Sequence, residues 1–347
     1  MRMTFVLLAL SVLFGGGLGD LAGADERTPQ ERQVDDALAR SLRFLAEQQK
    51  QSGAWALDDN GESTAGTSLA VMSFMACGHV PGEGPYGQAI ERGIRWVIEN
   101  QQDNGMLVTR HGTGPMYSHG ISTLMLAEAA GMVSDADAPA VRRALERAIK
   151  LILTSQAVKK DSRQRGGWRY QTNSTDSDLS VTGWQVMSLR AAKDIGCDIP
   201  KEAIDDAVDY VKKCSTNDNR GFGYQPGSHQ SETMTGTGIV CLEVCGENET
   251  REAIGGADYL LDRPIRANSN FFYYGVYYTS VGMFKIGGDY SERYRTHMID
   301  LLLPLQNQDG SWKPEHGSER GAGKIYATSM SVLALAIEYR YLPIYQR

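Results

Sequence analysis

Residues 166–189 read Gly-Gly-Trp-Arg-Tyr-Gln-Thr-Asn-Ser-Thr-Asp-Ser-Asp-Leu-Ser-Val-Thr-Gly-Trp-Gln-Val-Met-Ser-Leu. The stretch begins with a glycine–aromatic turn and continues through a polar loop that carries two carboxylates, Asp176 and Asp178. It ends in the start of an apolar segment that is rich in small residues. Most of the chain repeats this layout with other side chains, which predicts a repeat protein.

Glycine-containing turns recur along the chain with a period of about fifty residues, as helical repeats do. Five are clear, and they end at or include Trp55, Met106, Trp168, Tyr224 and Trp312. A sixth, degenerate unit lies near residues 266–271. Glutamines lead into several of the turns: Gln48, Gln49, Gln101, Gln102 and Gln306. The spacing predicts six copies of one structural unit.

Each turn is preceded by one kind of segment and followed by another. The preceding segments are amphipathic with the period of a helix, as between Ala89 and Val97 or between Val141 and Ile152. Pro139 and Pro200 lie just inside such segments, where a helix start tolerates proline. The following segments have few charges and many small or apolar residues, so that they must be enclosed by other helices. They are residues 68–77, 121–130, 181–192, 236–245, 279–286 and 327–337.

This alternation predicts outer helices with one face exposed to solvent and inner helices that are enclosed. Stacked pairs could form an open solenoid or close into a ring. The last inner segment, from Thr328 to Ile337, is as apolar as the middle ones, so the sequence lacks the polar capping repeat that an open solenoid needs. We therefore expect an all-α fold, an (α/α)6 toroid of six inner and six outer helices, as a single domain over residues 25–347. The strongest β-like run is residues 271–278.

The first two dozen residues have the pattern of an export signal. Arg2 precedes an apolar core from Phe5 to Phe14, and Ala22-Gly23-Ala24 has the small residues of a cleavage site. The core is too short to span a bilayer stably. We expect residues 1–24 to be a signal peptide and the mature protein to be exported, to a periplasm or outside the cell. No transmembrane segment is expected after its removal.

The composition excludes some partners and says little about others. A net charge of −7 argues against nucleic acid, because phosphate binding needs a basic face. The five cysteines fit no zinc pattern, and most lie in apolar helical contexts as small buried residues: Cys77, Cys197, Cys214, Cys241 and Cys245. No cofactor is expected. A protein partner remains open.

The repeated turns resemble those of the prenyltransferase and squalene-oxidase repeat proteins. This group includes the class II terpene cyclases and the β subunits of protein prenyltransferases, which share an α6/α6 toroid. Residues 308–312, Gln-Asp-Gly-Ser-Trp, look like the QW motif of the family, with weaker copies at the other turns. The resemblance covers nearly all of the chain after residue 24. It implies the fold more strongly than the function, because one toroid hosts many activities.

The resemblance implies two kinds of site, and the sequence departs from both. In class II cyclases the middle aspartate of an Asp-x-Asp-Asp motif protonates an alkene or epoxide. The matching run here places Asp178 at the middle position, but Leu179 replaces the last aspartate. The cyclases also enclose substrate between two helical domains, and this chain has the length of one. In prenyltransferases an Asp-x-Cys pair and a histidine hold zinc, and no Asp-x-Cys occurs here.

In a closed ring, all inner helices would start at the same face, and their positive dipole ends would converge on one mouth. Residues near these starts are the site candidates: Thr64, His119, Asp178, Glu232, Tyr274 and Tyr326. Asp176 and Asp178 could share a proton, which would raise one pKa and make an acid. The structural alternative is that Asp178 only caps its helix, since aspartate is a preferred N-cap.

Aromatic residues are the second group of candidates. On a helix, Tyr273, Tyr274 and Tyr277 would share one face, which could line a lumen, bind an apolar chain or stabilise a cation. The alternative is ordinary packing between the two rings of helices. Trp184 is a further candidate for the lumen wall.

Histidines complete the set. His119 would lie at the mouth, and His229 precedes another inner helix, although a lone histidine is more often a hydrogen-bonded structural residue. His111, His119 and His229 could in principle gather on a metal, but they lack a fixed ligand spacing, so no metal site is predicted.

We expect an exported, terpene-cyclase-like toroid that binds a small apolar ligand of isoprenoid type in an aromatic-lined lumen. If the protein is an enzyme, Asp178 would be the acid of a cyclisation and Asp176 its partner. Two alternatives stay open. One is a polysaccharide lyase or hydrolase on the same toroid, and the other is a non-catalytic binding or scaffold module.

Overall fold

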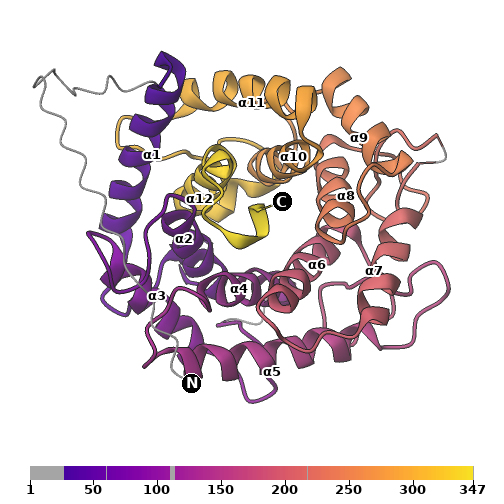
Figure 1. Cartoon of the computed structure of the whole chain (residues 1–347), viewed down its shortest axis with the longest axis horizontal. Coiled ribbons are helices and arrows are strands. Elements are labelled where there is room, and N and C mark those ends of the chain that lie inside the picture. Colours follow the sequence, from indigo (N-terminus) through magenta and orange to yellow (C-terminus); the bar gives the residue numbers. More distant parts are fainter. Residues whose placement is uncertain (1–26, 60, 110–113, 217, 347) are drawn as a thin grey trace, which may run out of the picture.

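The computed structural model describes residues 27–59, 61–109, 114–216 and 218–346. The predicted signal peptide, residues 1–24, lies outside this part of the chain. Two concentric rings of helices run in sequence order around a central axis (Figure 1). The inner helices are α2 (Thr64–Ala76), α4 (Pro115–Ala129), α6 (Leu179–Asp194), α8 (Glu232–Val244), α10 (Phe272–Ile286) and α12 (Gly323–Leu335). The outer helices are α1 (Pro29–Gln48), α3 (Gly87–Glu99), α5 (Ala138–Gln156), α7 (Lys201–Lys213), α9 (Arg251–Asp262) and α11 (Gly288–Leu302).

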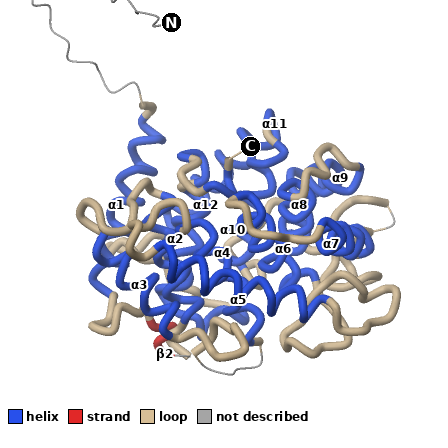
Figure 2. Tube along the Cα trace, turned by 60° about the horizontal axis from the view of Figure 1, so that its bottom comes forward, coloured by secondary structure: helices blue, strands red, loops and turns tan. Residues whose placement is uncertain are grey.

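The remaining elements are short. Two-residue strands β1 (Ala56–Leu57) and β2 (Gly61–Glu62) pair antiparallel beneath the ring (Figure 2). The 3-10 turns are η1 (Leu303–Leu305), η2 (Gly317–Ala322), η3 (Ile337–Tyr339) and η4 (Pro343–Tyr345). The run with the strongest β character, residues 271–278, lies almost wholly in α10, because its aromatic side chains are enclosed between helices. None of the helices described could cross a bilayer by length and hydropathy.

The ring is closed, as the sequence predicts. Each inner helix contacts the inner helices on both sides, and α12 contacts α2. The outer ring is closed by Gln306, whose Nε2 donates to the carbonyl oxygens of Gly310, in its own turn, and Ala37, in α1, at 3.1 and 2.8 Å. Gln49, Gln101 and Gln156 make the same pair of bonds between consecutive outer helices. These glutamines tie one repeat to the next.

The turn at Gly166 explains why the repeat carries a glycine. Its φ is +98°, and a Cβ there would lie 1.9 Å from the carbonyl oxygen of Asp206 in α7. Only glycine tolerates both conditions. In the fourth repeat the arrangement is reversed. Asn219 takes the left-handed conformation, and its carbonyl oxygen approaches Gly255 on α9 so closely that a Cβ on Gly255 would lie 2.0 Å from it. The turn and the next outer helix therefore approach about equally closely in both repeats, but the glycine lies in the turn in one and on the outer helix in the other.

The tryptophans of the turns are hydrogen bonded to the helices on both sides of them. The backbone N–H of Trp168 donates to Oγ1 of Thr182 at 3.0 Å, and its indole N–H donates to the carbonyl oxygen of Ile152 at 2.8 Å. Trp55 bonds to Thr67 and Leu45 in the same way, and Trp312 to Thr328 and Leu302. The tryptophan therefore joins the outer helix before the turn to the inner helix after it.

Candidate functional site

The inner helices that follow three of these turns begin in a shared way. The N-caps of α2, α6 and α8 are Ser63, Asp178 and Ser231, and each accepts a hydrogen bond from a backbone N–H three residues later. The cap's own N–H donates to the carbonyl oxygen of the turn aromatic, for example from Asp178 to Trp168 at 2.9 Å. Asp178 thus occupies a position that serine fills in two other repeats. Its capping function belongs to the fold.

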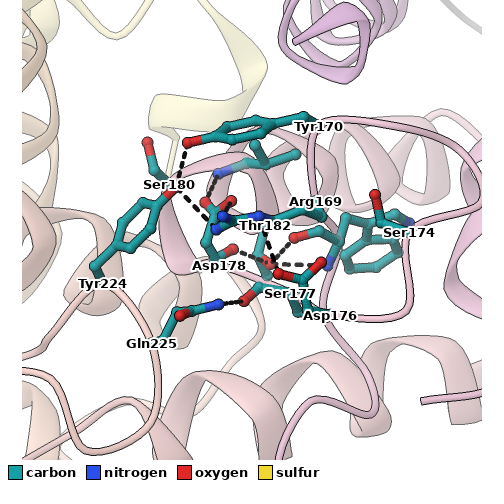
Figure 3. A network of polar contacts seen from close by, with 12 residues as sticks. Arg169, Tyr170, Ser174, Asp176, Ser177, Asp178, Ser180, Thr182, Tyr224 and Gln225 are labelled. Atoms are coloured by element: carbon teal, nitrogen blue, oxygen red, sulfur yellow. Dashed lines mark hydrogen bonds and ion pairs between the residues drawn. The ribbon is translucent and has the colours of Figure 1, made fainter. Parts of the chain in front are cut away.

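The second oxygen of Asp178 is particular to this repeat. Oδ1 accepts from Val181 N–H at 2.8 Å, and Oδ2 accepts from Nη1 of Arg169 at 3.1 Å. Arg169 also pairs through Nε with Asp176 at 3.3 Å, so the two carboxylates share a cation rather than a proton (Figure 3). The side chain of Asp178 is fully buried, whereas that of Asp176 is 48% exposed.

Burial raises the pKa of Asp178 to about 6, while the Val181 N–H, Arg169 and the Tyr224 hydroxyl oppose the rise. The carboxyl group is therefore ionised at neutral pH, when both of its oxygens accept from N–H groups. An acid that protonates an alkene must be neutral and must present its O–H to the substrate. The surroundings of Asp178 favour a fixed carboxylate.

Tyrosines surround this ion pair at the inner-helix starts. The Arg169 guanidinium lies 4.5 Å from the ring centre of Tyr170 and 5.4 Å from that of Tyr224, and their two hydroxyls are hydrogen bonded to each other (Figure 3). On the helix that Asp178 caps, the hydroxyl of Ser180 lies 2.7 Å from that of Tyr117, and Ser180 Oγ donates to the Tyr274 hydroxyl at 3.1 Å. We call this set the mouth: Tyr117, Arg169, Tyr170, Asp178, Ser180, Tyr224 and Tyr274.

Below the mouth, aromatic side chains form one wall of the lumen. Thr182 faces the outer ring, so residues two positions away on α6, Ser180 and Trp184, lie on the lumen side. The Trp184 ring stacks on that of Tyr277 with centroids 5.5 Å apart and planes at 5°, and it meets Tyr274 edge-on at 6.3 Å. We call Trp184, Tyr274 and Tyr277 the aromatic wall. All three side chains are buried.

Two neighbouring residues of α6, one of them in the aromatic wall, each have a polar atom without a hydrogen-bond partner among the described residues. The two atoms are Nε1 of Trp184 and Oε1 of Gln185, both buried. A buried donor or acceptor without a partner costs about 1–3 kcal/mol, so such atoms usually meet a water molecule or a ligand. The aromatic wall therefore offers one free donor, the indole N–H of Trp184.

The comparisons with known proteins agree with this architecture. The profile of the family described as the prenyltransferase α/α toroid domain matches residues 1–112, 140–272 and 263–344. The chain belongs to this family. No curated protein sequence matches the chain.

Solved structures with the same ring include members with different activities. One is a variant of the type II terpene cyclase MstE from Scytonema in complex with its substrate, geranylgeranyl dihydroxybenzoate. It is 15% identical, covers 91% of this chain and 99% of its own, and has a TM-score of 0.58. Another is an inactive variant of an α-1,6-mannanase of Salegentibacter sp. in complex with α-1,6-mannotriose, at 9% identity, 87% and 98% coverage and a TM-score of 0.66. These likenesses show the fold that the toroid shares with them.

The predicted inner-helix starts need correction in three of the six repeats. Thr64 and Glu232 are the first residues of α2 and α8, whereas His119, Tyr274 and Tyr326 lie inside their helices. The electrostatic influence of Glu232 is on Tyr259 of α9 and Tyr294 of α11, which places it toward the outer ring. His229 is exposed on the loop before α8. His111 lies outside the described residues.

The three tyrosines predicted to share a face separate. Tyr274 and Tyr277 belong to the aromatic wall, but the Tyr273 hydroxyl donates to the carbonyl oxygen of Lys313, in the loop after Trp312, at 3.1 Å. Glu319 from η2 caps α10, because its carboxylate accepts from the N–H groups of Tyr273 and Tyr274 at 2.9 and 2.8 Å. Tyr326 donates to the same carboxylate at 2.7 Å, so its hydroxyl supports this cap.

His119 is a structural residue in the toroid. It occupies the position of Thr67 and Thr182, since its Nδ1 accepts from Leu107 N–H at 3.1 Å. Its Nε2 therefore carries the hydrogen and donates to the Ala148 carbonyl oxygen at 3.2 Å. Both nitrogens are used. In the part of the chain that the structure describes, no three His, Cys, Asp or Glu side chains gather as a metal site would require.

Replacing His119 by threonine will remove part of the protein's acid sensitivity. Burial lowers the pKa of His119 to about 4, while in the unfolded chain it stays near 6.5. Between these values the unfolded state binds a proton that the folded state does not, so the free energy of unfolding falls as the pH decreases. The wild type should lose about 2 kcal/mol more than His119→Thr between pH 7 and pH 4.5. Urea denaturation at both pH values measures this, and equal losses would contradict it.

The mouth contains residues that the sequence did not single out. Tyr170 and Tyr224 each lie two residues after their turn aromatic, Trp168 and Phe222, which is a repeat signal visible in the sequence. Arg169 follows Trp168 directly. The contact of the loops that carry Tyr170 and Tyr224 depends on the packing of neighbouring repeats, so it becomes visible only in the folded chain.

Proposed function

We propose that this toroid is an exported binding protein for a neutral ligand of isoprenoid type, held against the aromatic wall, and that it does not begin a cyclisation from Asp178. The observation that carries the proposal is the buried indole nitrogen Nε1 of Trp184, which has no partner among the described residues and belongs to a ring stacked on that of Tyr277. An apolar chain with one hydrogen-bonding end would supply a partner for this donor. The binding of geranylgeranyl dihydroxybenzoate by MstE supports the ligand class.

The charges at the mouth support a neutral ligand. Arg169 is the cation that lies between the mouth tyrosines, and two carboxylates already balance it. A diphosphate or carboxylate end group would compete with Asp176 and Asp178 for one guanidinium. An alcohol or a ketone needs no counter-charge and can use the hydroxyl groups of the mouth or the wall.

The position of Asp178 supports binding rather than cyclisation. Serine fills the same cap in two other repeats, and the remaining carboxylate oxygen accepts from Arg169. Export remains part of the proposal, supported by the pattern of residues 1–24. The signal would place the toroid in a periplasm or outside the cell.

Binding of geranylgeraniol tests the proposal. Full-length mature protein should bind it with micromolar or better affinity, followed by tryptophan fluorescence and native mass spectrometry. Trp184→Phe keeps a ring but removes the indole N–H, so it should weaken binding about tenfold. Trp96→Phe, on outer helix α3, is the matched control and should leave the affinity unchanged. Absence of binding to the wild type would refute the proposed ligand.

A glycan ligand is the second candidate, because the rings of Tyr170 and Tyr224 are only partly buried beside the half-exposed Asp176. Partly exposed aromatic rings stack on sugars, and a carboxylate accepts from sugar hydroxyls. The same titrations with α-1,6-mannotriose separate the two candidates. Binding of the trisaccharide without binding of geranylgeraniol would favour the glycan, with Asp176→Asn as the variant that weakens it.

A further inference from the structure

Near the end of the described chain, apolar side chains are buried within the ring, although Gln346 itself is exposed. After α12 and η3, the chain turns back, and its last described residues approach the centre of the lumen (Figure 1). We call residues 342–346 the strap. Leu342, Ile344 and Tyr345 are buried, with at most 5% of each residue exposed. The strap therefore occupies space that the inner helices enclose.

Three inner helices hold the strap. Ile344 N–H donates to Oε2 of Glu128, at the end of α4, at 3.2 Å. Nζ of Lys285, at the end of α10, donates to the Gln346 carbonyl oxygen at 3.0 Å. η4 also packs against α6. Glu128 and Lys285 lie in the last turns of their helices, so the strap fills the end of the lumen opposite the mouth.

The strap reaches the aromatic wall. The hydroxyl of Tyr345 lies close to that of Tyr277, the ring that stacks on Trp184. Tyr277 in turn lies 3.8 Å from the sulfur of Met187. Tyr345 thus ends where the proposed ligand would have to extend. A chain that enters from the mouth and passes the wall meets this phenol ring.

The residues just before the strap border a large groove on the outside. This groove, of about 1260 Å³, lies between α1 and α11, and Glu338, Tyr339, Arg340 and Tyr341 line one side of it. Val34 and Phe284 contribute apolar side chains to it. One continuous segment therefore lines the groove with residues 338–341 and fills the lumen with residues 342–346.

We propose that the strap is a displaceable plug of the lumen. The strap withdraws toward the groove between α1 and α11 and frees the end of the lumen opposite the mouth for a longer ligand. The inference rests on the proposed function for the identity of the ligand, but not for the movement of the strap. Arg340, with φ +54°, marks the point where the chain changes direction. The strap is held by few polar contacts, one of which leaves Glu128 Oε1 without a partner among the described residues.

Glu128 gives the plug a pH dependence. Burial raises the pKa of its carboxyl group to about 8, against the opposing influence of the Ile344 N–H and Lys285, with Asp194 adding to the rise. Tyr277 and Tyr345, which also face it, keep their protons in this range because burial raises their pKa values. Opening would hydrate Glu128 and lower its pKa. The closed state therefore binds more protons, so that low pH favours closure and a rise toward pH 8 favours opening.

Hydrogen exchange on the full-length mature protein tests the plug. Amides of the strap should exchange at least a hundredfold faster than those of α6, because local opening requires less free energy than unfolding of the ring. After correction for intrinsic rates, strap exchange should rise about fiftyfold from pH 6 to pH 8 in the wild type, as linkage predicts for a closed-state pKa of about 8. Glu128→Gln should abolish this rise. Glu146→Gln, an exposed carboxylate on α5, is the control and should keep it.

Measurements of ligand binding separate the plug from the proposed ligand. Tyr345→Ala should bind geranylgeraniol at least tenfold more tightly than the wild type, and geranylgeraniol should speed strap exchange in the wild type. If the strap exchanges only together with α6, the plug is refuted, whatever binds at the mouth. If the strap opens as expected but neither protein binds geranylgeraniol, the proposed ligand fails and the plug stands.

Discussion

Replacing Gly166 by alanine will lower the free energy of unfolding by about 4 kcal/mol, or prevent folding, which is far more than a typical single substitution does. The residue has a φ of +98°, and the new Cβ would lie 1.9 Å from the Asp206 carbonyl oxygen. That oxygen belongs to the backbone of α7, so it can move only if the outer helix shifts. The shift would weaken the bonds that Gln156 makes to Gly166 and Ala203.

Gly196→Ala is the matched control for this prediction. Gly196 also has a positive φ, +85°, but nothing lies within 4 Å of the position that its Cβ would take. Gly196→Ala should lower the free energy of unfolding only by the backbone strain of a positive φ, about 1 kcal/mol. Urea denaturation of both variants measures the difference. Equal losses would show that the close approach of the turn to the next outer helix contributes little to the ring.

Replacing Arg169 by methionine will cost about 3 kcal/mol of stability at pH 8, because it leaves the buried carboxylate of Asp178 without its cation. The cost should be smaller at pH 5. Loss of Arg169 removes an influence that lowers the pKa of Asp178, so the group will be neutral at pH 5 and a neutral carboxyl group is less costly to bury. Urea denaturation at the two pH values measures the effect.

The double variant Arg169→Met with Asp178→Ser provides the control. Ser63 and Ser231 cap their helices from the same position, so serine should keep the cap of α6 while it removes the charge. The double variant should therefore recover most of the lost stability and lose the difference between pH 5 and pH 8. A double variant as unstable as Arg169→Met would mean that Asp178 has a role beyond the cap and the ion pair.

The ring could be predicted from the sequence because its signals are local and repeated. The glycine–aromatic turns, the amphipathic outer segments and the enclosed inner segments each recur at a similar spacing, and the apolar last helix indicates closure. The helix starts were less predictable. α10 begins at Phe272, where Glu319, from a loop distant in the sequence, accepts from the backbone N–H groups of Tyr273 and Tyr274. No feature of the aromatic run itself announces this cap.

The candidate site was predictable only in part, for a similar reason. The repeat alone indicates that Asp178 starts an inner helix and that Trp184 follows on that helix. The partners that decide their chemistry come from other repeats: Tyr224 for Arg169, and Tyr277 for Trp184. The contact between Glu128 and Ile344 joins residues that are 216 positions apart. Such pairs depend on how the closed ring brings segments together, which local pattern does not encode.

The most direct test of the central claim is the fate of geranylgeraniol after incubation with the wild type and with Asp178→Asn. Cyclisation is an isomerisation, so the bound material must be extracted and separated by gas chromatography rather than weighed. We expect both proteins to bind the alcohol and to release it unchanged. A cyclised product formed by the wild type but not by Asp178→Asn would contradict this expectation, and would return Asp178 to the role of acid.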